Sequence, residues 1–407
     1  MDINLSGEFR KMSVAEFDTT KLLAHAAQQA RQKKYAEFTI VDVDAHHYES
    51  EVMMEVLEYL EDPVLRQLMS ASSQPNAKSA RVLPSNVGYQ DMGGRISRYP
   101  LRKLEKPGAD GHREASLTRR WMDAIGIDIA VLFPTPMLGL GTHPQVEIEI
   151  ALSQAYNRWL VERVLSDEPR LISLLYLPMN DPEAAYRTVQ EFGGRKGVAG
   201  FLITSVHYKP VHANAYMKTY ALIEEMGLPI GFHGSFDWRE PTQSQLNKFI
   251  SVHALGFPWY NMVHMANWIM NGLPERFPKL KVAWIESGLA WVPFMMQRFD
   301  NEYQMRTSEC TMLKKKPSDY MRDMYFATQP MEATDMRMLE ETFRMMNAET
   351  QLVYSSDYPH WDFDLPSVIY DLKFVSEQGK RNILGGNAMR LFNIPQPAAK
   401  LAQIPMA

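Results

Sequence analysis

The sequence predicts a (β/α)8 TIM barrel, a fold of the α/β class, with an N-terminal extension and a long insertion after the first strand. From residue 117 onward, short apolar runs typical of buried strands alternate with segments typical of helices. This alternation indicates a parallel sheet, and eight strands, each followed by a helix, close into a barrel. The alternative is an open doubly wound sheet, but the Gly-x-Gly-x-x-Gly phosphate loop that would favour it is missing after the first strand.

The expected elements follow in order along three regions. Residues 1–37 form a helical extension, residues 38–395 form the barrel, and residues 396–407 form a tail. The insertion at 50–116 begins with a helix broken at Asp62-Pro63, and its Ser/Pro/Gly-rich remainder has the length of a functional lid. Strands are expected at 38–44, 128–134, 171–177, 198–204, 229–233, 281–285, 324–328 and 352–355. Helices are expected between them at 117–124, 146–165, 182–192, 214–226, around 264–271, 291–303, 333–346, 369–378 and 388–392.

Composition excludes several classes of protein. The net charge of −5 argues against a nucleic-acid partner. The single cysteine, Cys310, rules out an intrachain disulfide and a cysteine-based zinc motif. No apolar run reaches the roughly 20 residues that span a bilayer, and the N-terminus lacks the pattern of a secretory signal. We therefore expect a cytoplasmic enzyme without a membrane partner.

Ionisable side chains recur at the carboxyl ends of the expected strands, where TIM-barrel active sites lie. They are Asp44, His46 and Glu49 at the first strand, His233 at the fifth, Glu286 at the sixth, and Asp357 and His360 at the eighth. Several carboxylates gathered in one pocket repel one another, and a divalent cation resolves that conflict. Seven ligands exceed what one ion needs, which indicates two ions. A set rich in carboxylates suits manganese or iron at least as well as zinc.

Four further histidines have weaker support. His253 and His264 lie between the fifth and sixth strands, where each could reach the site or only pack within a helix. His207 follows the fourth strand, where a bridging ligand could sit. His47 points away from His46 if both lie on a strand, so we expect it to support the site from behind.

Several motifs together make the sequence resemble the amidohydrolase superfamily, specifically its aminocarboxymuconate-semialdehyde decarboxylase-like group. They include Val41–Glu49, Gly231-Phe232-His233, the run at 277–282 and Ser355–His360. The resemblance covers about residues 38–395 and implies the same barrel. It also implies one divalent metal held by Asp44, His46, His233 and Asp357.

Two positions depart from that family pattern. Asp44 and Glu286 stand where histidines are usual, and together with Glu49 and His360 they make the chain more similar to a divergent branch. That branch includes dinuclear-metal oxygenases such as 2-aminoisobutyrate hydroxylase. This resemblance implies an iron or manganese/iron oxygenase that uses dioxygen to hydroxylate a small polar organic or amino acid.

In that hypothesis Glu49, Glu286 and His360 hold the second ion, with His253 or His264 as further candidates. Arginines of the 50–116 insertion would bind the substrate carboxylate. Glu286, His360 and His253 are the expected catalytic residues.

Two alternatives remain open. The first is a hydrolase or non-oxidative decarboxylase that uses metal-bound water, possibly zinc-bound, with Glu286 or Asp357 as general base. The second is a non-enzymatic paralogue that supports a catalytic partner chain. The extension and the exposed apolar stretch at 257–260 favour an oligomer, which could include a related paralogous chain.

Overall fold

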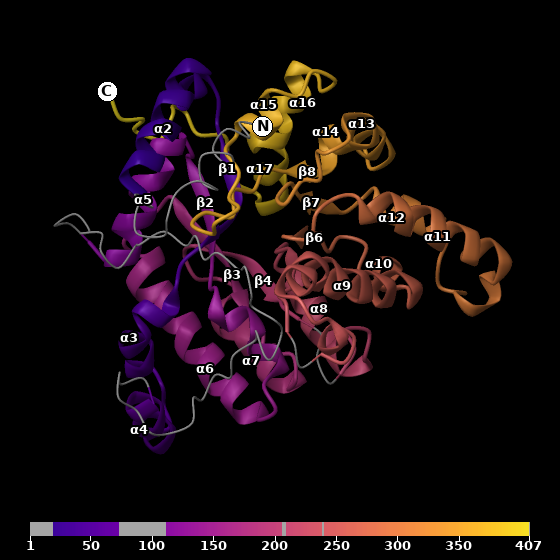
Figure 1. The fold of residues 1–407 in the computed structure, drawn as a ribbon. Helices are drawn as coiled ribbons and strands as arrows, with labels where there is room; N and C mark the ends of the chain where they lie inside the picture. Colours follow the sequence, from indigo (N-terminus) through magenta and orange to yellow (C-terminus); the bar gives the residue numbers. More distant parts are fainter. Residues whose placement is uncertain (1–18, 73–110, 206–208, 238–239, 407) are drawn as a thin grey trace.

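The structure is a computed structural model that describes residues 19–72, 111–205, 209–237 and 240–406 (Figure 1). Eight parallel strands lie side by side in chain order, surrounded by helices. They are β1 (Val41–His46), β2 (Ile129–Phe133), β3 (Leu171–Tyr176), β4 (Val198–Ile203), β5 (Ile230–His233), β6 (Val282–Ile285), β7 (Tyr325–Ala327) and β8 (Leu352–Val353). Each overlaps an expected strand, and β1 begins three residues and ends two residues later than expected.

Backbone hydrogen bonds close the sheet between its first and last strands. The amide of Val43 donates to the carbonyl of Tyr354 at 2.9 Å, and the amide of Asp357 donates to the carbonyl of Asp44 at 2.7 Å. Apolar side chains from alternate strand positions, such as Val131, Leu174 and Ile285, fill the interior. The predicted (β/α)8 barrel is confirmed.

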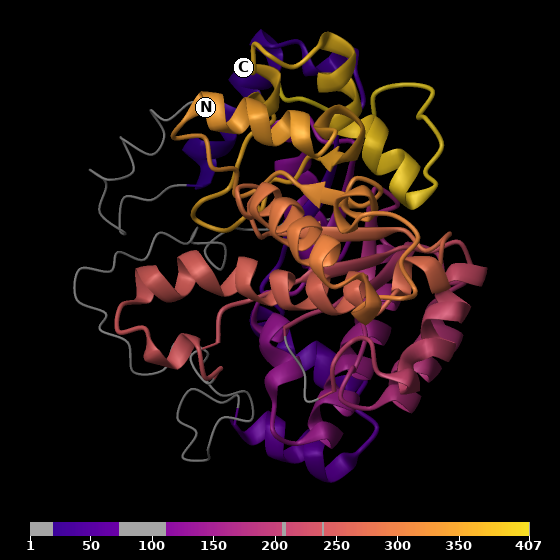
Figure 2. The same ribbon diagram turned by 90° about the vertical axis from the view of Figure 1, so that its right-hand side faces the viewer.

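The helices cover the outside of the barrel. They are α2 (Thr19–Gln32), α3 (Met53–Glu58), α4 (Pro63–Ser72), α5 (Arg113–Ile125), α6 (Val146–Trp159), α7 (Pro182–Phe192), α8 (Met217–Glu225), α9 (Phe249–Met270), α10 (Leu273–Arg276), α11 (Trp291–Met305), α12 (Pro317–Met321), α13 (Met336–Met345), α14 (Ala348–Gln351), α15 (Ser367–Tyr370), α16 (Glu377–Arg381) and α17 (Asn387–Phe392). In Figure 2 the first half of the salmon-coloured α9 extends beyond the barrel.

One expected helix is wrong. The segment 369–378 runs from the end of α15 to the start of α16, with non-helical residues between them, instead of forming one helix. Ser376 begins the second, because its hydroxyl accepts a hydrogen bond from the amide of Gly379 at 2.9 Å and so caps the new helix.

The described part of the N-terminal extension and the C-terminal tail both pack on the barrel. Helix α2 packs against α5, and its apolar face joins the main core. The buried carboxylate of Asp128 accepts hydrogen bonds from the amides of Leu401 and Ala402 at 2.7 and 3.1 Å. Lys400 adds an ion pair to the same carboxylate at 2.8 Å.

Part of the expected lid, residues 73–110 with its arginines, lies outside the described residues. Among the residues that are described, no helix combines the length and apolar character needed to cross a membrane.

Candidate metal centre

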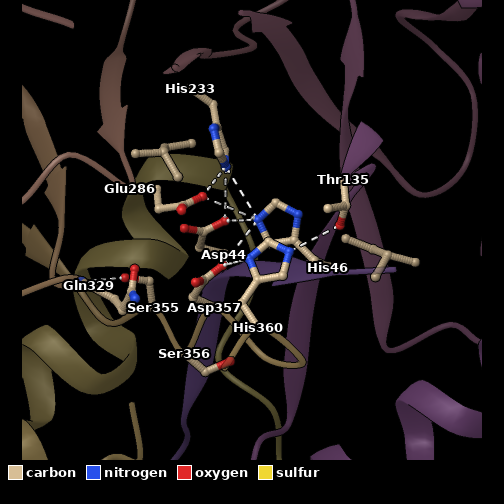
Figure 3. A network of polar contacts seen from close by, with 12 residues as sticks. Asp44, His46, Thr135, His233, Glu286, Gln329, Ser355, Ser356, Asp357 and His360 are labelled. Atoms are coloured by element: carbon tan, nitrogen blue, oxygen red, sulfur yellow. Dashed lines mark hydrogen bonds and ion pairs between the residues drawn. The ribbon is translucent and has the colours of Figure 1, made fainter. Parts of the chain in front are cut away.

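Side chains from four strands converge at the carboxyl end of the barrel (Figure 3). Nε2 of His46 lies 3.0 Å from Asp44, 3.4 Å from Asp357 and 3.6 Å from Glu286. Nε2 of His233 lies 3.1 Å from Glu286 and 3.4 Å from Asp44. The convergence follows from the parallel sheet, because the carboxyl ends of all its strands meet at one end of the barrel.

A β-bulge turns Asp44 into this site. On β1 Asp42 pairs with Ala130 and Ala45 pairs with Leu132, so two residues, Val43 and Asp44, lie opposite the single Val131. A bulge inserts one residue and breaks the alternation of side chains. Val43 can therefore belong to the barrel interior while its neighbour Asp44 also faces the site.

Two of the carboxylate residues have a strained backbone. Glu286 and Asp357 adopt φ values of 47° and 59°, in the left-handed region that side chains other than glycine rarely occupy. Such a conformation costs on the order of 1–3 kcal/mol and persists where the surroundings enforce it. Glu286 directly follows β6 and Asp357 lies four residues after β8, and this backbone conformation goes together with carboxylates that face the imidazoles.

The hydrogen bonds of the two central imidazoles fix their protonation pattern. Nδ1 of His46 lies 2.9 Å from the carbonyl oxygen of Pro134, and Nδ1 of His233 lies 2.7 Å from that of Gly234. A carbonyl only accepts, so each Nδ1 carries the proton. In the neutral rings both Nε2 atoms, which are 3.3 Å apart, then present lone pairs to each other and to the carboxylates.

While the two imidazoles are neutral, several buried carboxylate oxygens have no hydrogen-bond donor. They are both oxygens of Asp44, Oε2 of Glu286 and Oδ2 of Asp357. Buried acceptors without partners are costly, and lone pairs that converge on them add repulsion. A divalent cation coordinated by nitrogen and oxygen satisfies all of these atoms at once. The residues therefore fit a metal ion.

The pKa values of the metal-free cluster also reflect the crowding of negative charge. Burial lowers the pKa of His46, but the carboxylates of Asp44 and Glu286 outweigh burial and raise it to about 9. In the same way the carboxylates beside His233 outweigh burial and raise its pKa to about 10. Burial and then the charge of Glu286 raise the pKa of Asp357 well above its usual value. In the metal-free site, bound protons therefore supply the positive charge that a metal cation would otherwise supply.

The ligand atoms fall into two overlapping groups. One consists of Asp44, His46, His233 and Glu286, and the other of His46, Glu286, Asp357 and His360. All these residues are buried, and within each group the ligand atoms lie within 4.8 Å of one another. His46 and Glu286 belong to both groups. Six of the expected ligands are thus brought together.

Two expected ligands, Glu49 and His264, lie outside both ligand groups. Both oxygens of Glu49 accept hydrogen bonds from backbone amides, at 3.0 Å from Thr135 and 2.6 Å from Met137. Glu49 therefore anchors the turn after β2. Nε2 of His264 binds the carbonyl oxygen of Thr204 at 2.9 Å, and burial lowers the pKa of this imidazole to about 4. Neither residue belongs to a ligand group.

The other candidate histidines differ in their surroundings. His253 is half-buried among aromatic rings, 5.5 Å from the ring of Phe257 and 5.8 Å from that of Trp361, and it belongs to neither ligand group. Nε2 of His47 contacts the hydroxyl of Tyr156 at 2.8 Å on the outer side of the barrel. His207 lies outside the described residues.

Sequence reasoning missed two residues that support the site. Asp42 is fully buried, and its carboxylate accepts hydrogen bonds from the amide of Ser356 at 2.8 Å and from its hydroxyl at 2.5 Å. This contact ties β1 to the turn that carries Asp357. Thr135 contacts Nε2 of His360 at 3.1 Å. The signal for Asp42 was present, since a carboxylate inside an apolar strand needs a partner.

Comparisons with known proteins find similar sequences. Residues 43–394 match the family model described as amidohydrolase. The chain is 23% identical over 273 residues to 2-amino-3-carboxymuconate-6-semialdehyde decarboxylase of Dictyostelium discoideum, covering 66% of this chain and 73% of that protein. It is also 23% identical over 252 residues to gamma-resorcylate decarboxylase of a Polaromonas species, covering 58% and 75%.

Solved structures share the fold. The 5-carboxyvanillate decarboxylase of Sphingomonas paucimobilis superposes with a TM-score of 0.61 at 20% identity, covering 88% of this chain and all of that chain. A dihydroxybenzoic acid decarboxylase from Polaromonas, solved with bound manganese and 2-nitroresorcinol, gives a TM-score of 0.62 at 18% identity, covering 88% and 98%.

Proposed function

Because the chain belongs to the amidohydrolase family, we propose that it is a non-oxidative decarboxylase that uses a divalent metal ion to release carbon dioxide from a small organic acid. The buried ligand cluster, with carboxylate oxygens and imidazole nitrogens that one divalent cation can satisfy together, carries this proposal. Decarboxylation is favoured over hydrolysis because the similar curated proteins are named decarboxylases. The names of these similar proteins give no such support to the oxygenase hypothesis.

Manganese is the metal we propose first. The donors are imidazole nitrogens and carboxylate oxygens, which suit manganese, iron or zinc, and one decarboxylase of the same fold was solved with manganese. When bound, the ion supplies a positive charge that orients the substrate's acidic oxygens and stabilises negative charge on them. His46 and Glu286 would contact it whichever ligand group is filled.

The residues of the chain must also supply a proton. Loss of carbon dioxide leaves an electron pair on carbon, and a C–H bond forms when a donor protonates it. Oδ1 of Asp357 lies 2.6 Å from Nδ1 of His360, at one edge of the cluster. Burial and the charge of Glu286 raise the pKa of Asp357, so Asp357 can hold a proton when the ion occupies the group with Asp44 and His233, and we assign to it the protonation of the substrate carbon.

Turnover without oxygen tests the proposal. Manganese-loaded protein is incubated under argon with a panel of carboxylic acids, including 2,6-dihydroxybenzoate and small amino acids, and carbon dioxide is measured. In deuterated water the product should gain one deuterium at the carbon that lost its carboxyl group. Equal rates in argon and in air are expected. A requirement for dioxygen would contradict the proposal.

The second candidate is the dinuclear oxygenase. The observation in its favour is that two ligand groups share His46 and Glu286, an arrangement that can hold two adjacent ions. The same incubation separates the candidates when it is run in ¹⁸O-labelled dioxygen. An oxygenase places the label in a hydroxylated product, whereas a decarboxylase releases unlabelled product and carbon dioxide.

We also propose that the chain forms an oligomer. Helix α9 carries no charged side chain over its 22 residues, yet Ile250 and Leu255 are 76% and 54% exposed. A helix that is apolar on all sides is normally buried. A second copy or a related chain would bury these side chains.

A further inference from the structure

Three imidazoles meet at the cluster, and one ring nitrogen of each makes a hydrogen bond to an acceptor outside the cluster. His46 and His233 use backbone carbonyls, through Nδ1. His360 instead uses Nε2, and its partner is the side-chain hydroxyl of Thr135 at 3.1 Å. Among these three anchors in the described structure, Thr135 is therefore the one that a substitution can remove.

The hydrogen bonds of Thr135 determine where its single hydroxyl proton lies. Oγ1 of Thr135 is 2.9 Å from the carbonyl oxygen of His47, which can only accept. The hydroxyl donates to this carbonyl, so toward His360 the same oxygen acts as an acceptor. Nε2 of His360 must then carry a proton, and in the neutral ring Nδ1 presents its lone pair.

That lone pair faces the ligand cluster. Nδ1 of His360 lies 2.6 Å from Oδ1 of Asp357, and the ring stacks on His46 with centroids 4.3 Å apart. In the metal-free chain the protonated form of Asp357 donates to this lone pair, and a metal ion would take the place of that proton. Without the hydroxyl, the Nε2–H of His360 would have no acceptor, and a neutral ring would gain by carrying its proton at Nδ1, toward the ionised form of Asp357. The ring would then offer no lone pair to a metal ion.

The backbone of Thr135 is held independently of its side chain. Its amide donates to Glu49 at 3.0 Å, and the same buried carboxylate binds the amide of Met137 at 2.6 Å. The turn after β2 is thus fixed when the hydroxyl is removed. A Thr135→Val substitution keeps the shape of the side chain and deletes the hydroxyl, which is the acceptor for His360 and the donor to the carbonyl of His47.

We propose that Thr135 is a positioning residue that fixes the protonation pattern of His360, so that Nδ1 of His360 faces the metal cluster. The inference rests on metal binding and not on which reaction the metal supports. The group of His46, Glu286, Asp357 and His360 depends on Thr135. The group with Asp44 and His233 does not.

Nitrogen-15 NMR of metal-free, histidine-labelled protein measures this protonation pattern directly, with His360→Gln used to assign the resonances. The wild-type ring is expected to be protonated at Nε2 and bare at Nδ1. Thr135→Val is expected to move the proton toward Nδ1, and Thr135→Ser, which keeps the hydroxyl, to restore the wild-type pattern. A bare Nε2 in the wild type would overturn the proposal even if Thr135→Val failed to fold.

Titration with Mn²⁺, followed by the electron paramagnetic resonance of the free ion, gives the second readout. Thr135→Val is expected to weaken binding of the Mn²⁺ ion at the group with His360 about 10–100-fold, the usual effect of losing the partner of a metal ligand, and to leave an ion at the group with Asp44 and His233 unaffected. Thr135→Ser should stay near wild type, and so should Thr188→Val, a control that removes a buried hydroxyl bonded to a backbone carbonyl on α7. Equal losses in Thr135→Ser or Thr188→Val would overturn the proposal. If the wild type bound no Mn²⁺, the proposed function would fail while the NMR result still decided the role of Thr135.

Discussion

Raising the pH should destabilise the metal-free chain and leave the metal-loaded chain stable. Without metal, the pKa of His46 is raised to about 9 and that of His233 to about 10. A group whose pKa is raised by folding stabilises the fold in its protonated form. That contribution is complete below the unfolded-state pKa of about 6.5 and is lost as the pH rises through the folded-state values.

The size of the effect follows from the shift. For His46 the rise from 6.5 to about 9 corresponds to about 3 kcal/mol, at about 1.4 kcal/mol per pKa unit. His233 interacts with the same carboxylates, so the two contributions do not add. We take about 3 kcal/mol as the combined contribution of the two histidines to the free energy of unfolding. With an unfolding entropy of about 2.1 cal/mol/K per residue, a chain of 407 residues should lose about 4 °C in Tm.

Calorimetry of chelator-treated and Mn²⁺-loaded protein between pH 6.5 and 10 provides the measurement. Metal ligands must lose their protons to bind, so the stabilisation by Mn²⁺ should increase over this range. A His46→Gln/His233→Gln double variant should lose the pH dependence of the metal-free protein. If the Tm of the metal-free wild type stays level or rises toward pH 10, the reasoning is wrong.

Three further predictions follow from the same structure. Glu49→Ala should lower the free energy of unfolding by about 2–4 kcal/mol, because two buried amides lose their acceptor, while the ion of the Asp44 and His233 group remains by elemental analysis. Asp357→Asn should reduce kcat for decarboxylation about 10²–10⁴-fold, as expected for loss of a proton donor, in a protein whose circular dichroism is unchanged. Light scattering should give a mass above the 46.8 kDa of one chain, and Ile250→Lys on α9 should shift it toward one chain; a wild-type monomer would exclude the proposed oligomer.

The strands were predictable from short apolar runs in the sequence. Most ligands were predictable because the carboxyl ends of parallel strands meet at one end of a barrel. Each strand is a short apolar run, and parallel topology brings the strand ends together. Residues at those ends, such as His233 and Glu286, therefore meet without any knowledge of the loops. The prediction of one helix at 369–378 was wrong because Ser376 caps a new helix within this segment.

The placement of Asp44 was correct for an incomplete reason. Strict alternation from the inward-facing Val41 and Val43 would turn Asp44 outward. Only the bulge opposite Val131 turns it inward, and a bulge depends on the pairing of two strands, which one strand's sequence does not contain.

Glu49 could not be assigned from sequence for a similar reason. Its distance from Asp44 and His46 along the chain suits a third ligand. Its direction, however, depends on where unpaired amides lie after β2, at Thr135 and Met137. A buried carboxylate takes the nearest donors, and these come from a segment more than 80 residues away.

Elemental analysis of metals per chain tests the central claim most directly, on protein produced in medium replete in manganese, iron and zinc. His46 belongs to both ligand groups, so His46→Ala should retain about a tenth or less of the wild-type metal, given the usual loss of affinity around metal ligands. His264→Ala is the matched control, since His264 binds a backbone carbonyl. We predict at least one divalent ion per chain in the wild type and in His264→Ala. A metal-free wild type, or full metal content in His46→Ala, would contradict the account.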